Sequence, residues 1–281
     1  MRSIGIIGLG LIGGSMAKAI SSRTEYKVYG SDASSSVTDR AIKEGVLAGR
    51  LEEHIDDIDM LMVALYPLDV VDIILEISDR LPKGCIVIDC TGVKGIICGA
   101  LSEKLAEKGL RFIGGHPMAG KEVAGYENAC DDLFDGASMI LCRDDHTDEE
   151  AMREACGLFS GLGFSQVKIT TAEEHDRVIA YTSQLAHVVS SAYIKSPTLE
   201  KRYGFSAGSF KDLTRVAKLN EEMWADLFIA NEKAIVSEID EIAGHLKEYR
   251  DAIAAGDRAK LVSLLAEGRI RKEEDERKDR P

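Results

Sequence analysis

The feature that most constrains this chain is a glycine motif placed directly after a strand-like apolar run at residues 3–7. Gly8-Leu9-Gly10-Leu11-Ile12-Gly13 fits the pattern G-x-G-x-x-G, and a helical pattern follows it. In a βαβ unit, the first glycine permits a tight turn, the second lets backbone approach a pyrophosphate, and the third allows close helix–strand packing. The helix that follows directs its N–H groups at the phosphates. We therefore expect Gly8, Gly10, Leu11, Ile12 and Gly13 to contact a dinucleotide.

An acid at the end of the next strand supports this interpretation. Asp32 stands 19 residues after Gly13, where a carboxylate can accept hydrogen bonds from the adenosine ribose. A carboxylate at this position also repels a 2′-phosphate, so the sequence predicts NAD rather than NADP. Arg40 could meet that phosphate, but its place on a predicted helix favours a solvated surface residue.

Strand-like and helical patterns alternate through the first half of the chain, which is typical of βαβ units and a parallel sheet. Expected strands are Ser3–Gly8, Lys27–Ser31, Met60–Leu65, Cys85–Cys90, Arg111–Gly114 and Ala137–Cys142, and expected helices are Ile12–Ser22, Ser36–Glu44, Leu68–Leu81 and Ile96–Lys108. The strands are continuous apolar runs, as they should be when helices cover both faces of a sheet. The fold class is therefore α/β, with an N-terminal doubly wound Rossmann-type sheet.

The second half looks entirely helical. We expect helices over Ala172–Ile194, Phe210–Val216, Glu221–Arg250 and Asp251–Arg271, followed by a charged tail over Lys272–Pro281. This change of character predicts a dinucleotide-binding domain at residues 1–170 and an all-helical substrate and dimerisation domain at residues 171–281. Long helices with apolar faces indicate a homodimer.

Composition excludes several classes of function. The net charge of −13 argues against nucleic-acid binding, because the phosphate backbone rewards positive surface. Charges interrupt every apolar stretch, so no membrane span is expected, and the start of the chain lacks a signal-peptide pattern. We expect a cytoplasmic protein without a metal site. Its six cysteines are scattered and are expected to be reduced thiols, mostly buried.

Two further turns should lie at the carboxyl edge of the sheet, where open α/β folds bind ligands. The turn Ala64–Pro67 is expected to bring Leu65 and Pro67 over the cofactor. The turn Asp89–Gly95 should bring Thr91 against both cofactor and substrate, because its glycines allow a close approach. Lys94 in this turn could meet a substrate anion or the carbonyls at a helix end.

Three histidines are candidates for catalysis. His116 precedes a proline between glycines, which predicts a rigid turn at a strand end beside the nicotinamide. A neutral imidazole there suits the acceptance of a hydroxyl proton. His175, followed by Asp176, starts a helix, where capping explains both residues. His187 lies on an apolar helical stretch and therefore faces either the core or a cleft, with periodicity favouring the core.

A cluster near residue 215 is the candidate anion site. Arg215 stands in a largely apolar helical context, which suggests a carboxylate partner. That partner could be an anionic substrate or an internal acid, and Asp212 is near enough in sequence to be one. Trp224 is expected to anchor the core.

Six motifs occur along the chain in this order: Gly8–Ser15, Asp89-x-x-Gly92-Val93-Lys94, Gly115–Gly120, Ser183-x-Leu185-x-His187, Phe210-Lys211-Asp212-x-Thr214-Arg215 and Met223-Trp224. In this order and combination, they resemble the motifs of the prephenate/arogenate dehydrogenases of tyrosine biosynthesis, and the resemblance runs from residue 3 to about residue 240. The resemblance implies a Rossmann domain, a helical dimerisation domain, and NAD-dependent oxidative decarboxylation of prephenate to 4-hydroxyphenylpyruvate.

The resemblance also implies roles for single residues. His116 matches the histidine that hydrogen-bonds the ring hydroxyl, and Arg215 matches the arginine that binds a prephenate carboxylate. Glu122 and Asp212 match acids of an ionic network around the entrance, and His187 matches a histidine near the active site. Gly92 departs from the family, because many members carry a serine there that helps to orient the hydroxyl. Thr91 or a water would have to replace it.

Four other functions fit parts of the pattern, and the first is that of an arogenate dehydrogenase. Arogenate differs from prephenate only by an amino group in place of the oxo group. Another β-hydroxyacid dehydrogenase or an imine reductase would be expected to carry a catalytic lysine in the helical half, where only Lys195 and Lys218 are present. A non-catalytic NAD sensor would not need His116 and Arg215.

Overall fold

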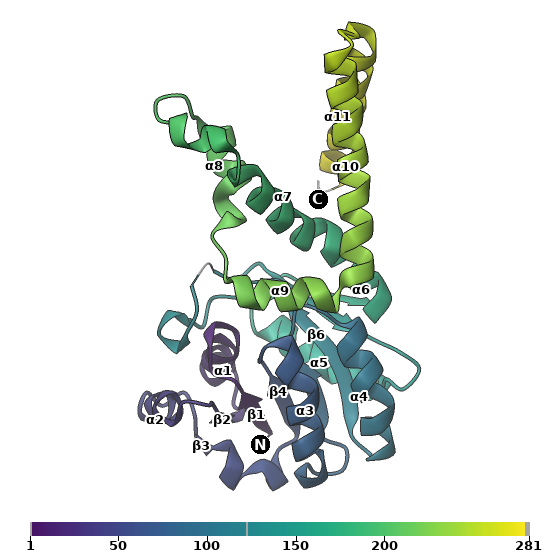
Figure 1. Ribbon diagram of the computed structural model, residues 1–281. Helices are drawn as coiled ribbons and strands as arrows, with labels where there is room; N and C mark the ends of the chain where they lie inside the picture. The colour runs from purple at the N-terminus through teal and green to yellow at the C-terminus, as the bar shows by residue number, and fades with distance from the viewer. Residues whose placement is uncertain (1, 122, 279–281) are drawn as a thin grey trace. The chain divides into compact units, whose positions relative to one another are not determined.

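The computed structural model describes residues 2–121 and 123–278 (Figure 1). Its strands are β1 Ser3–Ile7, β2 Lys27–Ser31, β3 Gly49–Arg50, β4 Met60–Val63, β5 Ile86–Asp89, β6 Arg111–Pro117, β7 Ser138–Cys142 and β8 Gln166–Thr170. Its α-helices are α1 Leu11–Arg23, α2 Ser35–Lys43, α3 Pro67–Ile77, α4 Gly95–Glu107, α5 Glu149–Gly161, α6 Ala172–Ile179, α7 Leu185–Ile194, α8 Gly208–Thr214, α9 Glu221–Ala230, α10 Glu232–Ala254 and α11 Arg258–Lys278.

The strands form one eight-stranded sheet in the order β3-β2-β1-β4-β5-β6-β7-β8. All neighbours are parallel except β6 and β7. The chain runs outward from β1 to β3 and then returns to the other side of β1 with β4. This reversal makes the carboxyl ends of β1 and β4 the place where an α/β fold of this kind binds its ligand.

Strand periodicity divides the core into two layers. Met60 and Met62 of β4 pack on one face of the sheet with α1, α2 and α5. Leu61 and Val63, the alternate residues, pack on the other face with α3 and α4. Side chains of successive strand residues point to opposite faces, so a strand covered on both sides is apolar throughout. The α/β architecture expected from the sequence is confirmed.

The structure adds elements to those expected and extends another. Helix α5 and strands β3 and β8 were absent from the sequence prediction. Strand β6 runs to Pro117 rather than ending at Gly114, because the antiparallel pairing with β7 places His116 opposite Ile140. His116 therefore lies in the last residues of a strand and not on a free turn.

The helical half is more broken than the sequence pattern predicts. The stretch from Ala172 to Ile194 is interrupted by a π-turn at Ala180–Gln184, which joins α6 to α7. The predicted helix Glu221–Arg250 is two helices, because it breaks at Asn231 between α9 and α10. The next break falls at residues 255–257 rather than at residue 250, where Gly256 has a positive φ of 66°. A left-handed glycine is a common helix terminator.

The chain divides into two compact units, residues 1–232 and 233–281. The first unit holds the sheet, its covering helices and also α6 to α9. The second unit holds nearly all of α10 together with α11, and the Tyr249 hydroxyl donates a hydrogen bond of 3.1 Å to the Leu264 carbonyl between them. The expected domain boundary between residues 170 and 171 stays a prediction.

All six cysteines are free thiols. Cys85, Cys98 and Cys142 are buried among apolar side chains of the sheet and α4. Burial raises the pKa of Cys85 and Cys142 to about 12. These thiols are therefore small core residues and not nucleophiles.

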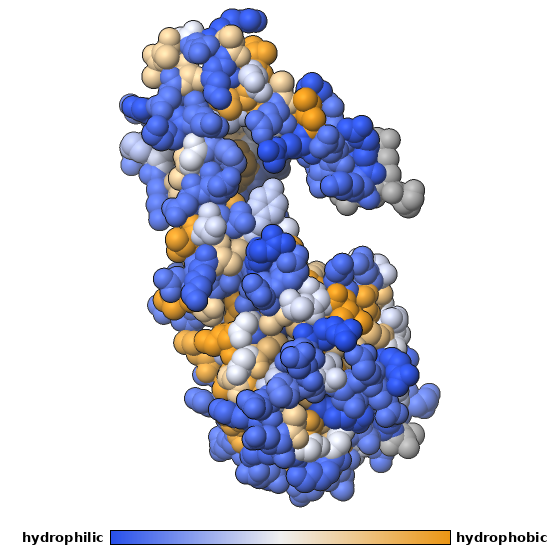
Figure 2. Space-filling model, turned by 90° about the vertical axis from the view of Figure 1, so that its right-hand side faces the viewer, coloured by the Kyte–Doolittle hydropathy of each residue, from blue (hydrophilic) through white to orange (hydrophobic). Residues whose placement is uncertain are grey.

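Figure 2 shows one face of the molecule, on which apolar residues gather only in limited patches among hydrophilic ones. In the described part of the chain, no helix is both long enough and apolar enough to span a bilayer.

Gly13 should tolerate no side chain. A Cβ at this position would lie 1.8 Å from the Gly8 carbonyl oxygen, so Gly13→Ala must displace the backbone of the glycine turn. We expect it to lower the free energy of unfolding by about 1–3 kcal/mol. Gly99→Ala is the matched control, because a Cβ on this exposed position of α4 meets nothing within 4 Å. It should stabilise by about 0.5–1 kcal/mol. Urea unfolding measures both, and equal effects would contradict the packing argument.

Candidate active site

The glycine turn after β1 has the geometry that a pyrophosphate needs. Gly8 has a φ of 86°, and a Cβ there would lie 2.4 Å from the Ala64 carbonyl oxygen at the end of β4. A Cβ on Gly10 would meet nothing within 4 Å, so the space beside this residue is open. Gly10 is the N-cap of α1, and Leu11 and Ile12 form its first turn. Backbone N–H groups at such a helix start favour phosphate oxygens. These residues fit a dinucleotide.

Asp32 follows β2 and braces the same turn. One carboxylate oxygen accepts a hydrogen bond of 2.8 Å from the Leu9 N–H, and the other accepts one of 2.9 Å from the Ser34 N–H. The side chain remains partly exposed. Because each carboxylate oxygen has more than one acceptor site, Asp32 can also accept from ribose hydroxyls.

The turn after β4 continues this edge of the sheet. Leu65 is partly buried, and Pro67 is the buried first residue of α3. Tyr66 between them is 51% exposed and occupies the N-cap position of α3 without a side-chain hydrogen bond to the helix. The turn therefore lies beside the glycine motif, as the close approach of Gly8 to Ala64 requires.

The loop after β5 is held by a buried ion pair. The Lys94 ammonium contacts the Asp89 carboxylate, and both side chains are fully buried. Lys94 also donates to the Thr91 hydroxyl at 3.1 Å and to the Gly115 carbonyl at 2.6 Å. All three ammonium hydrogens thus have protein acceptors. This corrects the expectation that Lys94 meets a substrate anion: it braces the loop from inside.

Thr91 belongs to the same internal network. It is 3% exposed, and its hydroxyl lies 2.7 Å from an Asp89 carboxylate oxygen and 2.9 Å from the Val93 carbonyl. Gly92, the next residue, is partly exposed. The loop therefore presents backbone around Gly92 rather than the Thr91 side chain.

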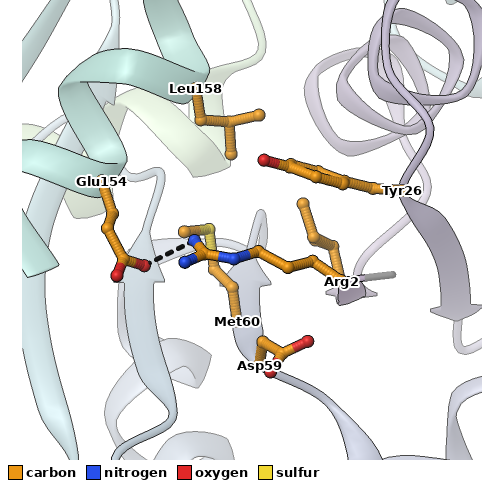
Figure 3. A pocket seen from close by; sticks show the side chains of 7 residues that line it. Arg2, Tyr26, Asp59, Met60, Glu154 and Leu158 are labelled. Atoms are coloured by element: carbon orange, nitrogen blue, oxygen red, sulfur yellow. Dashed lines mark hydrogen bonds and ion pairs between the residues drawn. The ribbon is translucent and has the colours of Figure 1, made fainter.

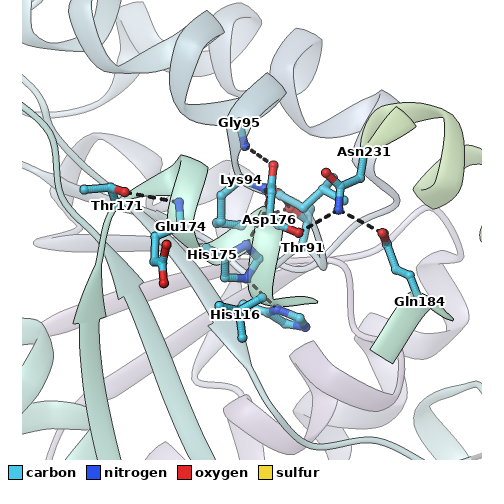
Figure 4. A network of polar contacts seen from close by, with 12 residues as sticks. Thr91, Lys94, Gly95, His116, Thr171, Glu174, His175, Asp176, Gln184 and Asn231 are labelled. Atoms are coloured by element: carbon cyan, nitrogen blue, oxygen red, sulfur yellow. Dashed lines mark hydrogen bonds and ion pairs between the residues drawn. The ribbon is translucent and has the colours of Figure 1, made fainter. Parts of the chain in front are cut away.

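His116 stands beside this loop and is joined to two residues of α6 (Figure 4). Its Nδ1 lies 2.9 Å from Nε2 of His175, and Nδ1 of His175 lies 2.7 Å from the Asp176 carboxylate. Burial holds the pKa of the His116 imidazole well below its usual range, and the positive charge of Lys94 lowers it further. His116 is therefore neutral at physiological pH, so one of its ring nitrogens has a lone pair that can accept a proton.

The capping role expected for His175 and Asp176 is wrong for their own helix. Thr171 caps α6, because its hydroxyl accepts from the Glu174 N–H at 3.2 Å. His175 and Asp176 are instead 2% and 8% exposed. The signal available in the sequence was a His-Asp pair following a threonine that already supplies the cap.

A second group of side chains comes from α7 to α9. His187 is half-buried and stacks on Trp224 with ring centroids 3.7 Å apart, and its Nδ1 lies 3.0 Å from the Ser183 carbonyl. Burial lowers the pKa of His187, and the positive charge of Arg215 lowers it further. His187 and Trp224 are therefore not core residues. Arg215 is exposed on the turn that follows α8 and packs against α7.

Gly92 links the two groups. A Cβ on Gly92 would lie 3.3 Å from a methyl carbon of Leu227 and 3.8 Å from Nε2 of His116. Leu227 lies one turn after Trp224 on α9, and its carbonyl accepts a hydrogen bond of 3.2 Å from Gln184. Helix α9 therefore spans the distance between His116 and the ring stack.

Two expected site residues remain. Asp212 is exposed on α8, one turn before Arg215. Glu122 lies outside the described residues. Within the described ranges, no group of three His, Cys, Asp or Glu side chains is arranged to hold a metal ion.

A small cavity at the opposite edge of the sheet is not part of this site. Figure 3 shows Arg2, Tyr26 and Met60 around it, with Arg2 donating to Glu154 at 2.6 Å. Its volume is about 20 Å³. That is room for a single water and not for a substrate.

Comparisons with known proteins identify the family to which the chain is related. The family model "Prephenate dehydrogenase, nucleotide-binding domain" matches residues 16–168, and "Prephenate dehydrogenase, dimerization domain" matches residues 171–267. The chain is 31% identical to the cyclohexadienyl dehydrogenase of Zymomonas mobilis, over 95% of this chain and 93% of that protein. It is 30% identical to a prephenate dehydrogenase of Lactococcus lactis, over 96% of this chain and 76% of the relative.

A solved structure has the same fold throughout. Prephenate dehydrogenase from Aquifex aeolicus, in complex with hydroxyphenyl propionate and NAD⁺, superposes with a TM-score of 0.87 at 29% identity, over 98% of each chain. A Rossmann sheet with an open glycine turn and a neutral imidazole at its carboxyl edge defines a nucleotide-binding dehydrogenase. Within that class, the chain belongs to the prephenate dehydrogenase family.

The role of Lys94 can be tested by removing its charge. Lys94→Met leaves the Asp89 carboxylate buried without its cation, so we expect a loss of about 3–5 kcal/mol in the free energy of unfolding. Lys108→Met is the control, because this lysine pairs at 2.6 Å with Asp79, whose side chain is 80% exposed. An exposed pair contributes about 1 kcal/mol or less. Guanidinium unfolding compares the two. A Lys94→Met enzyme of unchanged stability but higher substrate KM would restore the substrate-binding role.

Proposed function

We propose that this enzyme converts prephenate to 4-hydroxyphenylpyruvate and carbon dioxide with NAD as the hydride acceptor, a step of tyrosine biosynthesis. The observation that carries the proposal is the neutral His116, placed beside Gly92 at the same sheet edge as the glycine turn. The relative from Aquifex aeolicus supports it, since that protein is described with NAD⁺ and hydroxyphenyl propionate. Hydroxyphenyl propionate has the ring and the carboxylate side chain of the proposed product.

NAD bound at the glycine turn supplies the acceptor for the hydride of the ring carbinol carbon. His116 takes the proton of the ring hydroxyl, so that the carbinol becomes a ketone. The ring carboxylate leaves as carbon dioxide, its bonding electron pair enters the ring, and the ketone oxygen becomes a phenolate that takes the proton back from His116 to give the phenol. Aromatisation makes this second step favourable. The protein's tasks are then orientation, proton acceptance and recognition of charge.

Arg215 is the proposed anchor for a substrate carboxylate. A guanidinium binds a carboxylate through two parallel hydrogen bonds, which fixes both position and orientation. The positive charge of Arg215 contributes to the lowered pKa of His187, the residue that stacks on Trp224. Prephenate carries two carboxylates and no ammonium, which suits a site with this cation. Arogenate would add an ammonium, for which Asp212 and Glu122 are the candidate partners.

We propose NAD over NADP from the charge at Asp32. Its carboxylate braces Leu9 and Ser34 and lies where the adenosine ribose of a bound nucleotide is expected. A 2′-phosphate would meet this negative charge. The proposed assembly is a homodimer, which the match to a dimerization-domain model over residues 171–267 supports. A cytoplasmic location is proposed on the same family grounds.

Turnover by the purified enzyme tests the function directly. NADH formation is followed by absorbance with prephenate and, separately, with arogenate, each with NAD and with NADP. We expect prephenate with NAD to give the highest kcat/KM. A preference for arogenate would retain the mechanism and change the substrate, whereas silence with both would overturn the proposal. Turnover with NADP equal to that with NAD would remove the argument from Asp32.

The variant His116→Asn tests the proposed role of His116 in the same assay. Asparagine cannot accept the hydroxyl proton, so turnover should fall by roughly 10²–10⁴-fold. The affinity for NAD, measured by fluorescence titration, should stay close to that of the unmodified enzyme. Undiminished turnover would exclude His116 as the proton acceptor.

Arg215→Ala should act on substrate binding. Loss of the guanidinium removes a carboxylate contact, so we expect the KM for prephenate to rise by at least about tenfold, equivalent to roughly 1.4 kcal/mol, with a smaller change in kcat. Lys218→Ala removes the same charge from an exposed neighbour three residues later and serves as control. Steady-state kinetics compare the two variants. Equal shifts in KM would mean that only the general electrostatic field matters.

A further inference from the structure

The contacts of His116 indicate which of its two ring nitrogens carries the hydrogen. Its Nδ1 faces Nε2 of His175 at 2.9 Å, and the other nitrogen of His175 faces the Asp176 carboxylate at 2.7 Å. His175 and Asp176 follow each other on α6, 59 residues after His116. These contacts form a continuous chain from a carboxylate to the candidate proton acceptor (Figure 4).

Asp176 is the fixed end of this chain. The oxygen that faces His175 also accepts from the Lys94 N–H at 2.8 Å, and the other oxygen accepts from the Gly95 N–H at 2.7 Å. Both N–H groups belong to the start of α4, where the helix dipole favours a negative charge. An ionised carboxylate can only accept hydrogen bonds. The nitrogen of His175 that faces it must therefore carry a hydrogen.

A hydrogen on Nδ1 of His175 leaves two arrangements between the rings, which differ in whether Nε2 of His175 carries a hydrogen or a lone pair. In the arrangement with a lone pair on Nε2, the hydrogen between the two rings belongs to Nδ1 of His116. We propose that Asp176 and His175 are positioning residues that hold His116 as the Nδ1–H tautomer and leave its Nε2 as the proton acceptor. The inference rests on the proposed function for the identity of the proton that Nε2 accepts.

The free nitrogen faces the proposed substrate. Nε2 of His116 lies 3.8 Å from the position that a Cβ on Gly92 would take, at the partly exposed part of the loop after β5. Nδ1 faces the interior, where the His175 side chain is fully buried. The opposite tautomer would put a hydrogen on Nε2 and turn His116 into a donor toward the substrate hydroxyl.

The same chain can hold the charge that the reaction creates. Once Nε2 takes up a proton, the His116 ring is positive in a buried setting, and Lys94 opposes that charge. Asp89 neutralises Lys94 from β5, and Asp176 attracts the new charge through His175 from α6. An oriented carboxylate behind a catalytic imidazole both fixes the tautomer and stabilises the imidazolium.

The tautomer can be observed without substrate. In the full-length enzyme labelled with ¹⁵N-histidine, long-range ¹H–¹⁵N correlation spectra distinguish protonated from unprotonated ring nitrogens, and loss of signals in His116→Asn identifies the residue. At neutral pH we expect a protonated Nδ1 and an unprotonated Nε2 on His116. A hydrogen on Nε2 of His116, facing a doubly protonated His175, would overturn the inference.

Variants at His175 test the consequence for catalysis. Phenylalanine keeps a ring but offers no acceptor, so His175→Phe should shift the His116 spectrum toward the other tautomer and lower kcat by roughly 10- to 100-fold. Its KM for NAD should not change. Glutamine offers an amide oxygen that can accept from Nδ1–H of His116, but the amide cannot take up a proton. His175→Gln should therefore retain the tautomer and keep more of kcat than His175→Phe. His146→Gln, exposed after the antiparallel strand β7, should leave kcat unchanged.

The outcomes separate this inference from the proposed function. If the tautomer is as expected but prephenate is not turned over, the proposed function is contradicted and the positioning role remains. If prephenate is turned over rapidly and His175→Phe leaves kcat unchanged, only the positioning role is contradicted. Thermal unfolding monitors the fold of each variant. If His175→Phe fails to fold, the spectrum of the unmodified enzyme and the kinetics of His175→Gln still decide.

Discussion

The carboxyl edge of the sheet depends on one buried ion pair. Asp89 and Lys94 lie at the two ends of the loop after β5, and burying either charge alone would be costly. Together they are satisfied, and the remaining donors of Lys94 hold Thr91 and the Gly115 carbonyl. Gly115 precedes His116 on β6. A single ammonium therefore joins β5, its loop and β6, and so determines where Gly92 and His116 stand relative to each other.

Asp176 extends this order to the helices that follow the sheet. Its side chain caps α4, its neighbour His175 contacts His116, and its own carbonyl accepts from Asn231 at 2.9 Å. Asn231 in turn donates to Gln184 at the end of the π-turn. Each of these groups is buried and hydrogen-bonded. Displacing one of them would therefore leave its partner buried without a hydrogen bond, because no bulk water reaches it. The nucleotide-binding sheet and α6 to α9 are thus connected by hydrogen bonds as well as by apolar packing.

Local sequence signals predicted what is local in the fold. The glycine turn, Asp32 and His116 are recognisable because a short motif carries both their chemistry and their place at a strand end. His175 was misread because its contact with His116 joins positions 59 residues apart, which periodicity does not encode. Lys94 was misread for the same reason: a lysine in a glycine-rich loop resembles an anion-binding residue until Asp89 is seen behind it. The break at Asn231 was invisible because the flanking pattern remains helical.

The π-turn at Ala180–Gln184 restricts how the chain length can change during evolution. His175 and His187 are 12 residues apart, which in a continuous α-helix would leave them roughly 120° apart around the axis. A π-turn accommodates about one additional residue, or roughly 100° of that rotation, and so brings the two side chains back toward one side. Substitutions between these histidines can preserve that alignment. Removal of that additional residue would leave a regular α-helix with the two histidines roughly 20° apart, so the alignment should survive a single-residue deletion within the π-turn. A single-residue insertion into either flanking helix would instead rotate His187 away from His175 by roughly 100°, and should be selected against.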